Sequence, residues 1–267
     1  MFTKSAPPHI RAEGSVPQIL WTVALSLLPA VFVTLIFLKF QAFRILVVAA
    51  ASAVLAEMGI RRLFKKKSTL YDGSAVLVAL LLALLLPSTV PSWQVALASA
   101  FAIIFGKEIF GGLGQNPFHP ALVGRAFLMA AFPFSTPPVL SSLLDAGGVV
   151  PCLALLGGGT VLLFKRLIRW EILLLYLGSI FLFSVALGGR VEEVLFSGTI
   201  LLAAFFLVTD PVTTPLTRWG ERWFALGSGL LTLAIRQGTS TVEGVTYGIL
   251  IMNALNPWFD HWFRPRL

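Results

Sequence analysis

Apolar runs of roughly membrane-spanning length follow one another along this chain, separated by short polar turns. A helix of about 20 apolar residues crosses the hydrocarbon core of a bilayer. With 57% hydrophobic and 12% charged residues, the chain is too apolar for a soluble domain. We therefore predict an all-α polytopic membrane protein, a single integral membrane domain over residues 1–267. Its roughly ten transmembrane helices are expected at 18–38, 42–60, 74–87, 93–110, 120–134, 148–164, 171–187, 194–208, 222–236 and 243–259.

Two of these runs are short and resemble each other. One opens with Asp-Gly-Ser at 72–74 and ends in a Pro- and Trp-bearing segment at 87–93. The other opens with Ser-Gly-Thr at 197–199 and ends in Asp-Pro-Val-Thr-Thr-Pro at 210–215. Both are about 13 residues long, too short to cross a bilayer as straight helices. Such paired, Pro/Gly-interrupted segments are typical of transporter cores with broken helices at the membrane midplane. The alternative is that these turns are ordinary loops and the similarity is chance.

The distribution of Lys and Arg predicts the orientation. Basic clusters follow the second, sixth and tenth apolar runs, at 61–67, 165–169 and 264–266. The positive-inside rule places these clusters, and with them both termini, on the cytoplasmic side. The second short run then has the opposite direction to the first, which predicts two inverted five-helix repeats at about 18–134 and 148–260. The net charge of +8 is explained by this loop bias, so nucleic acid is not a predicted partner.

A polar, glycine-rich turn at 111–120 lies between the fourth and fifth predicted spans. Glycine lets the backbone approach a ligand or a neighbouring helix closely. Asn116 precedes Pro117 and is placed to cap the next helix. The turn is not a phosphate-binding P-loop, because no Gly-Lys-Ser/Thr follows it. A tight turn without a ligand is the alternative interpretation.

Ionisable residues at membrane depth are costly and therefore point to function. Asp72 and Asp210 lie at ends of the two short runs, Lys107 and Glu108 lie near the end of another span, and Glu57 lies deeper in the second span. Side chains near helix ends can also reach water, which lowers that cost. Carbonyls and hydroxyls at broken helices suit a hard cation such as Na⁺. The predicted central site, or ion path, consists of Asp72, Gly73, Asn116, Asp210, Thr213 and Thr214.

The cysteine and histidine residues of the chain indicate neither a disulfide nor a metal site. The single Cys152 rules out a disulfide or a cysteine-ligated cluster within this chain. His9, His119 and His261 lack metal-ligand spacing, so no protein-bound metal site is predicted.

Several segments resemble the RnfD/NqrB membrane subunits of the Rnf and Na⁺-translocating NADH:quinone oxidoreductase complexes, with RnfD the closer match. The resemblance runs nearly end to end. The segments that carry it are 5–11, 71–75, 111–121, 209–215 and 251–255.

The resemblance implies a ten-helix inverted-repeat fold similar to that of urea transporters. It implies a subunit of a complex that couples electron transfer between ferredoxin and NAD⁺ to pumping of Na⁺ or H⁺, rather than a catalyst acting alone. The implied partners are the other membrane and peripheral subunits, including flavin- and iron–sulfur-bearing ones, and the lipid bilayer. The implied location is the cytoplasmic (inner) membrane of a bacterium or archaeon.

The resemblance also implies a flavin. In the family this subunit carries FMN joined by a phosphoester bond to a threonine on the outer face, and riboflavin, where present, is non-covalent. Thr136 before Pro137 is the position that aligns, although Pro133, Phe134 and Ser135 replace the family's upstream glycine and alanine pattern. Asn116 and His119 are predicted as further cofactor contacts.

Three alternatives follow for function. In the first, flavin redox change here or in a partner biases a two-state helix arrangement and so gates ion access. In the second, Thr136 is a hydroxyl in a Pro-rich turn and the chain is a flavin-free scaffold or ion-path subunit of the same complex. In the third, the same fold serves as a stand-alone solute channel or facilitator, since fold does not fix function.

Overall fold

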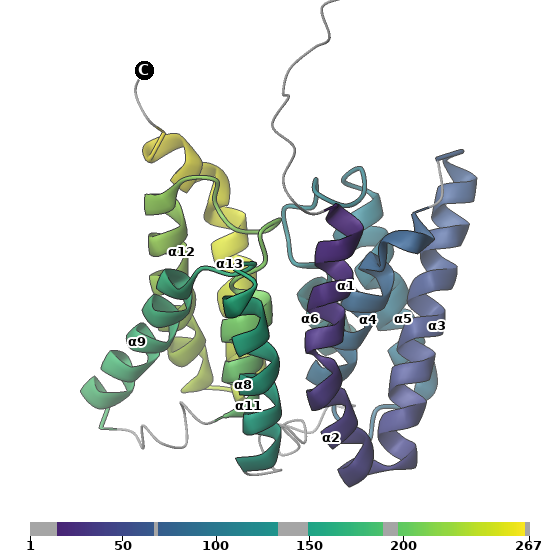
Figure 1. Cartoon of the computed structure of the whole chain (residues 1–267), viewed down its shortest axis with the longest axis horizontal. Coiled ribbons are helices and arrows are strands. Elements are labelled where there is room, and N and C mark those ends of the chain that lie inside the picture. Colours follow the sequence, from purple (N-terminus) through teal and green to yellow (C-terminus); the bar gives the residue numbers. More distant parts are fainter. Residues whose placement is uncertain (1–14, 67–68, 133–148, 189–196, 265–267) are drawn as a thin grey trace, which may run out of the picture.

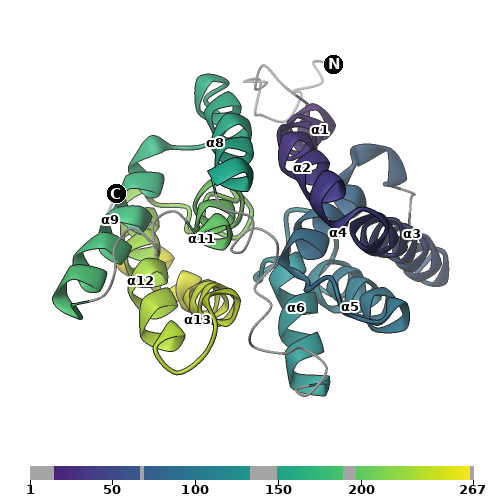
Figure 2. The same cartoon turned by 90° about the horizontal axis from the view of Figure 1, so that it is seen from below.

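The computed structural model describes residues 15–66, 69–132, 149–188 and 197–264. These residues form helices and turns, with no strand among them. The helices gather in two groups that lie side by side (Figures 1 and 2). The first group comprises α1 (Val16–Ser26), α2 (Leu28–Leu38), α3 (Phe40–Leu63), the short η1 (Leu70–Asp72), α4 (Ser74–Leu85), α5 (Ser92–Ile103), η2 (Ile104–Glu108) and α6 (Pro120–Ala131). The second comprises α8 (Val149–Phe164), α9 (Trp170–Ala186), α11 (Gly198–Leu202), η3 (Ala203–Leu207), α12 (Arg218–Arg236) and α13 (Thr241–Trp262).

Within the described ranges, every predicted span coincides with helix, and most ends agree to within a few residues. The first span differs, because it is divided between α1 and α2 at Leu27, with Pro29 in the first turn of α2. Two other spans end in a π-helical turn, η2 and η3. In a π turn each backbone N–H donates to the carbonyl five residues earlier instead of four. Such π turns are rare and frequently occur at functional sites.

The lengths of the helices show which spans are too short to cross a bilayer as a single straight helix. Within the described residues, the stretch Val16–Leu38 and helix α3 are both long and apolar enough to cross by themselves. The apolar helices α4, α6, α8, α9 and the α11–η3 pair are shorter. Irregular backbone at membrane depth must then find hydrogen bonds inside the protein. Arg44 provides this after α4, because its Nη2 donates to the carbonyl oxygens of Ser88 (3.2 Å) and Val90 (2.8 Å).

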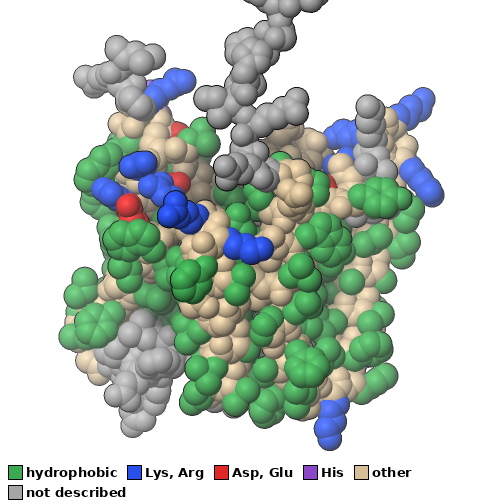
Figure 3. All heavy atoms as spheres, in the orientation of Figure 1, with side chains coloured by type: hydrophobic (Ala, Val, Ile, Leu, Met, Phe, Trp, Pro, Cys, Tyr) green, Lys and Arg blue, Asp and Glu red, His purple; other side chains and the backbone are tan. Residues whose placement is uncertain are grey.

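The outer surface suits a lipid environment. Large apolar side chains such as Phe32, Phe43, Leu55 and Leu182 are more than half exposed on their helices. In the face shown in Figure 3, apolar side chains cover the middle of the molecule, and Lys and Arg lie toward its two ends. Helix α1 begins, and α13 ends, on the same side (Figure 1). These two helix ends on one side agree with the predicted even number of crossings; that this side is cytoplasmic stays a prediction.

The two groups meet along two seams. Helices α1 and α2 pack on α8, and α6 packs on α13 (Figure 2). The first seam is very close, since a Cβ added to Gly158 of α8 would lie 1.9 Å from the carbonyl oxygen of Ser26. Between the two seams, α4 and η3 face the candidate site.

Candidate functional site

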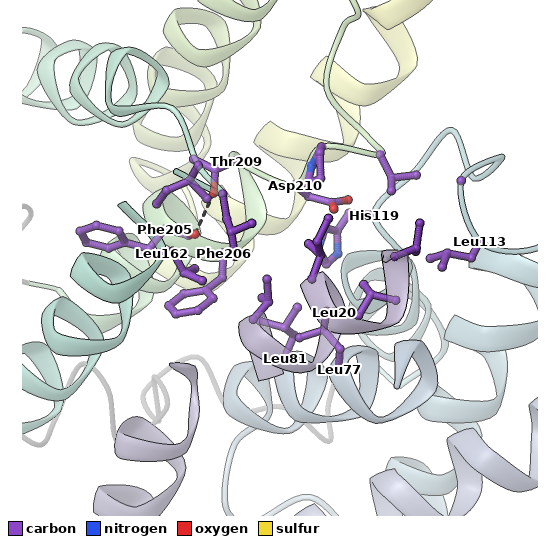
Figure 4. A pocket seen from close by; sticks show the side chains of 18 residues that line it. Leu20, Leu77, Leu81, Leu113, His119, Leu162, Phe205, Phe206, Thr209 and Asp210 are labelled. Carbon is purple, nitrogen blue, oxygen red and sulfur yellow. Dashed lines mark hydrogen bonds between the residues drawn. The ribbon is translucent and has the colours of Figure 1, made fainter. Parts of the chain in front are cut away.

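A cavity of about 300 Å³ lies between the two helix groups. Its walls come from α1, α4, α8, η3 and the turns at 113–119 and 209–212. Figure 4 shows leucines of α1 and α4 on one side, Phe205 and Phe206 on the other, and the polar pair Asp210 and His119 at one end. The cavity is therefore mostly apolar, with its polar groups concentrated at one end.

A second, smaller space adjoins this polar end, and we call it the polar chamber. Its volume is about 50 Å³, and it shares His119 and Asp210 with the larger cavity. It adds three polar side chains, Ser74, Lys107 and Asn116. A space of this size holds a small ion or a few water molecules.

Two buried polar atoms of residues that line the polar chamber lack hydrogen-bond partners. Asn116 is 5% and His119 3% exposed, and the Asn116 Oδ1 and His119 Nδ1 atoms have no hydrogen-bond partner in the structure. Buried polar atoms are normally satisfied, so such a pair indicates a bound group or water. The backbone of His119 is fixed, because its N–H donates to Asn253 Oδ1 on α13 (3.2 Å).

Asp210 is held in place by its own turn. Its Oδ2 accepts from Thr213 Oγ1 (2.9 Å), and its backbone carbonyl accepts from Thr214 Oγ1 (3.1 Å). The turn is tied to α13 through Asn253, whose Nδ2 donates to the carbonyl of Thr213 (2.8 Å). Thr213 and Thr214 thus position the Asp210 carboxylate, and neither borders the chamber.

Asp72 and Gly73 shape the start of α4. The Asp72 Oδ1 atom accepts from the Ser74 N–H (2.8 Å) and from Ser74 Oγ (2.6 Å). Gly73 has a φ of +77°, and a Cβ there would lie 2.8 Å from the Trp21 ring, so both its backbone and its surroundings require glycine. Asp72 does not itself border the chamber; Ser74 does, and it links Asp72 to Lys107.

A buried charge cluster adjoins the chamber, formed by Glu57 and Arg61 of α3 and Lys107 and Glu108 of η2. Lys107 Nζ lies 3.0 Å from Glu57 Oε1 and donates to Ser74 Oγ at 2.6 Å. Arg61 donates to Glu108 Oε1 from Nε (3.1 Å) and Nη2 (3.0 Å). All four residues are at least 90% buried. Lys107 belongs to both the cluster and the chamber.

The structure therefore brings Asn116, His119 and Asp210 together around the polar chamber. Gly73, Thr213 and Thr214 do not border it. Thr136 lies outside the described residues. Sequence reasoning missed the roles of Ser74, Asn253 and Arg61. A signal existed for Arg61, because it follows Glu57 by four residues, the spacing at which helical side chains pair.

These features together define a helical membrane protein with a partly buried polar site between two groups of helices. The family model described as NQR2, RnfD, RnfE matches residues 3–140 and 136–267, so the chain belongs to this family.

Three relatives are similar to the chain over nearly their whole lengths. It is 36% identical to an ion-translocating oxidoreductase complex subunit of Methanosarcina acetivorans, covering 97% of this chain and 94% of the relative. It is 35% identical to a subunit of the Na⁺-translocating ferredoxin:NAD⁺ oxidoreductase complex of Acetobacterium woodii (100% and 95% covered). It is 33% identical to a subunit of the proton-translocating ferredoxin:NAD⁺ oxidoreductase complex of Clostridium ljungdahlii (99% and 95% covered).

Proposed function

We propose that this chain is the ion-path subunit of an Rnf-type ion-translocating ferredoxin:NAD⁺ oxidoreductase complex, and that the polar chamber holds the cation in transit at Asp210. Membership of such a complex is proposed because the relatives are subunits of such complexes. The observation that carries the site is the convergence of the Asp210 carboxylate with two unpaired buried acceptors, Asn116 Oδ1 and His119 Nδ1. Other subunits of such a complex, with their flavins and iron–sulfur clusters, are the proposed partners.

The charge of Asp210 favours a bound cation. No ion pair with Asp210 occurs among the residues that the structure describes. Asp210 is partly buried beside a mostly apolar cavity, where a carboxylate without a compensating charge is costly. A small cation would supply that charge and would be coordinated by the carboxylate and the Asn116 amide oxygen, with the His119 imidazole beside them. Because hard cations prefer oxygen ligands, we infer Na⁺ as the cation.

The inverted repeat is part of the same proposal. Helix α4 and the α11–η3 pair each form the third predicted span of their group, and α4 and η3 both border the cavity. Helix α4 starts and η3 ends at the chamber, as expected if the two run in opposite directions. In the proposed mechanism, a redox change in a flavin of the complex shifts these two helix groups between two arrangements and so alters cation access to Asp210. The urea-transporter-like form of the repeat is the arrangement we propose for this.

Replacing Asp210 with asparagine is expected to remove most of the Na⁺ transport of the assembled complex. The side chain keeps its size and can still accept from Thr213, but loses the charge that attracts the cation. The measurement is uptake of ²²Na⁺ into vesicles carrying the complex, driven by reduced ferredoxin and NAD⁺. Asp260→Asn on α13, whose Oδ1 accepts from the exposed Leu216 N–H, is the matched control and should transport normally. Undiminished uptake by the Asp210 variant would contradict the proposed site.

The flavin part of the proposal depends on the resemblance alone. The polar chamber, at about 50 Å³, is smaller than a flavin ring system, whereas His119 also borders the adjoining cavity of about 300 Å³. When bound, FMN would supply one-electron redox chemistry, and the Thr136 hydroxyl would be its attachment atom through a phosphoester bond.

For Thr136 we expect a fluorescent flavin band on a denaturing gel of the chain from its native host, together with an FMN-sized mass increment. Thr136→Val should abolish both, because it removes the hydroxyl oxygen and keeps the branched shape. Ser135→Ala is the matched control and should retain the band. A dark band at unmodified mass for the wild-type chain would exclude covalent flavin and leave the ion-path role unaffected.

A further inference from the structure

We propose that Lys107 is a built-in counter-cation of the polar chamber, and that Glu57 regulates the chamber's cation affinity by holding the Lys107 ammonium away from Asp210. This inference rests on the proposed cation site and adds a regulating element to it. It concerns the charge cluster of Glu57, Arg61, Lys107 and Glu108.

The position of Lys107 is unusual. It is 1% exposed, and it borders the same chamber of about 50 Å³ as Asp210, Asn116 and His119. Its Nζ is bound to Glu57 Oε1 (3.0 Å) and Ser74 Oγ (2.6 Å) rather than to the Asp210 carboxylate. A cation site and a fixed ammonium thus share one small enclosed space, so each raises the free energy of the other's charge.

Glu57 is the main anchor of this ammonium. Its Oε1 faces Lys107, accepts from Thr69 Oγ1 and lies 3.5 Å from Arg61 Nε. Its Oε2 is buried and has no hydrogen-bond partner. Loss of the Glu57 charge would therefore release Lys107.

The other charged groups around Lys107 hold it less strongly. Glu108 Oε1 is 3.8 Å from Nζ and already accepts two hydrogen bonds from Arg61. Asp72 acts on Lys107 only through Ser74 Oγ. Across the chamber lie His119 and Asp210. Since a lysine side chain is a point charge on a flexible stem, an ammonium released from Glu57 would move toward the unpaired Asp210 carboxylate and displace its cation.

A single and a double variant therefore separate the effect of the Lys107 ammonium from that of the Glu57 charge. Glu57→Gln releases the ammonium and is expected to weaken Na⁺ binding about tenfold or more. Glu57→Gln combined with Lys107→Met removes both charges of the pair, leaves the net charge of the cluster unchanged and should restore Na⁺ binding to the wild-type level or above. If the pair had a purely structural role, the second substitution would not reverse the loss caused by the first.

The experiment is a titration of the assembled complex in detergent with NaCl, at constant ionic strength with choline chloride. The unfolding midpoint of this subunit rises as Na⁺ binds the folded state, and the half-maximal concentration reports the affinity. The half-maximal NaCl concentration is expected to be much higher for Glu57→Gln than for the wild type. For the double variant it should equal the wild-type value or lie below it. Glu171→Gln, a partly exposed carboxylate paired with Arg222, is the control and should titrate as wild type.

The outcomes separate the two proposals. The cation site is supported if the wild-type response saturates and Asp210→Asn abolishes it. The role of Lys107 is overturned if, in addition, the half-maximal NaCl concentration changes equally in the single Glu57 variant and in the double variant, or changes in neither. If the wild type shows no saturable response to NaCl, the Na⁺ site itself is overturned, and the regulation by Lys107 with it.

Discussion

Lys107→Met as a single change is expected to lower the free energy of unfolding by roughly 3–5 kcal/mol, the usual cost of removing one partner from a buried ion pair. The variant would leave Glu57 fully buried and without its nearest cation, and would leave Ser74 Oγ without its donor. Methionine fills nearly the same volume, so little of this loss would come from packing. The measurement is the thermal unfolding midpoint and the yield of the detergent-solubilised complex.

Two controls make this expectation specific. Lys165→Met applies the same substitution to an exposed lysine beyond α8, and its effect should stay within about 0.5 kcal/mol. Adding Glu57→Gln to Lys107→Met removes the stranded carboxylate, so the double variant should recover most of the loss. Equal stability of the Lys107 and Lys165 variants would show that the buried pair contributes nothing.

The helices could be predicted from the sequence because hydropathy alone determines where a chain can cross a bilayer. The break at Leu27 and the two π turns could not, since they change hydrogen-bond partners without changing apolar composition. Arg61 illustrates a related limit. Counting basic residues assigned it to a cytoplasmic loop, yet it is buried against Glu108, because sidedness carries no information about contacts.

The positions of the polar residues could be predicted in part for a physical reason. Asp72 precedes one short helix and Asp210 follows the other, and Ser74 at the start of the first helix and Asp210 both border the chamber. Polar residues at the ends of the two short helices therefore lie near one another; that they form an ion site stays a prediction. Which oxygen would face the chamber could not be predicted, because it depends on local hydrogen bonds: the Asp72 carboxylate turns to Ser74, whereas Asp210 borders the chamber.

The close seam between α1 and α8 offers a test of how the cavity is held together. Gly158→Ala would place a Cβ 1.9 Å from the Ser26 carbonyl oxygen and 3.5 Å from the Phe206 ring. A backbone oxygen cannot swing aside as a flexible side chain can, so α8 must move away from α1. We expect a destabilisation of about 1–3 kcal/mol from this overpacking.

The neighbouring Gly157 provides a matched control, because it lies on the same helix and a Cβ there would meet nothing within 4 Å. Gly157→Ala should be neutral or stabilising by up to about 1 kcal/mol, since alanine favours helix over glycine. The two variants differ only in which face of α8 receives the methyl group, so the difference between their unfolding midpoints measures the seam alone. Leu162 and Phe206 line the cavity from α8 and η3, so a shifted α8 should also weaken the NaCl response of the Gly158 variant. Equal midpoints for the two variants would mean that the seam tolerates separation and that the cavity wall is not fixed by it.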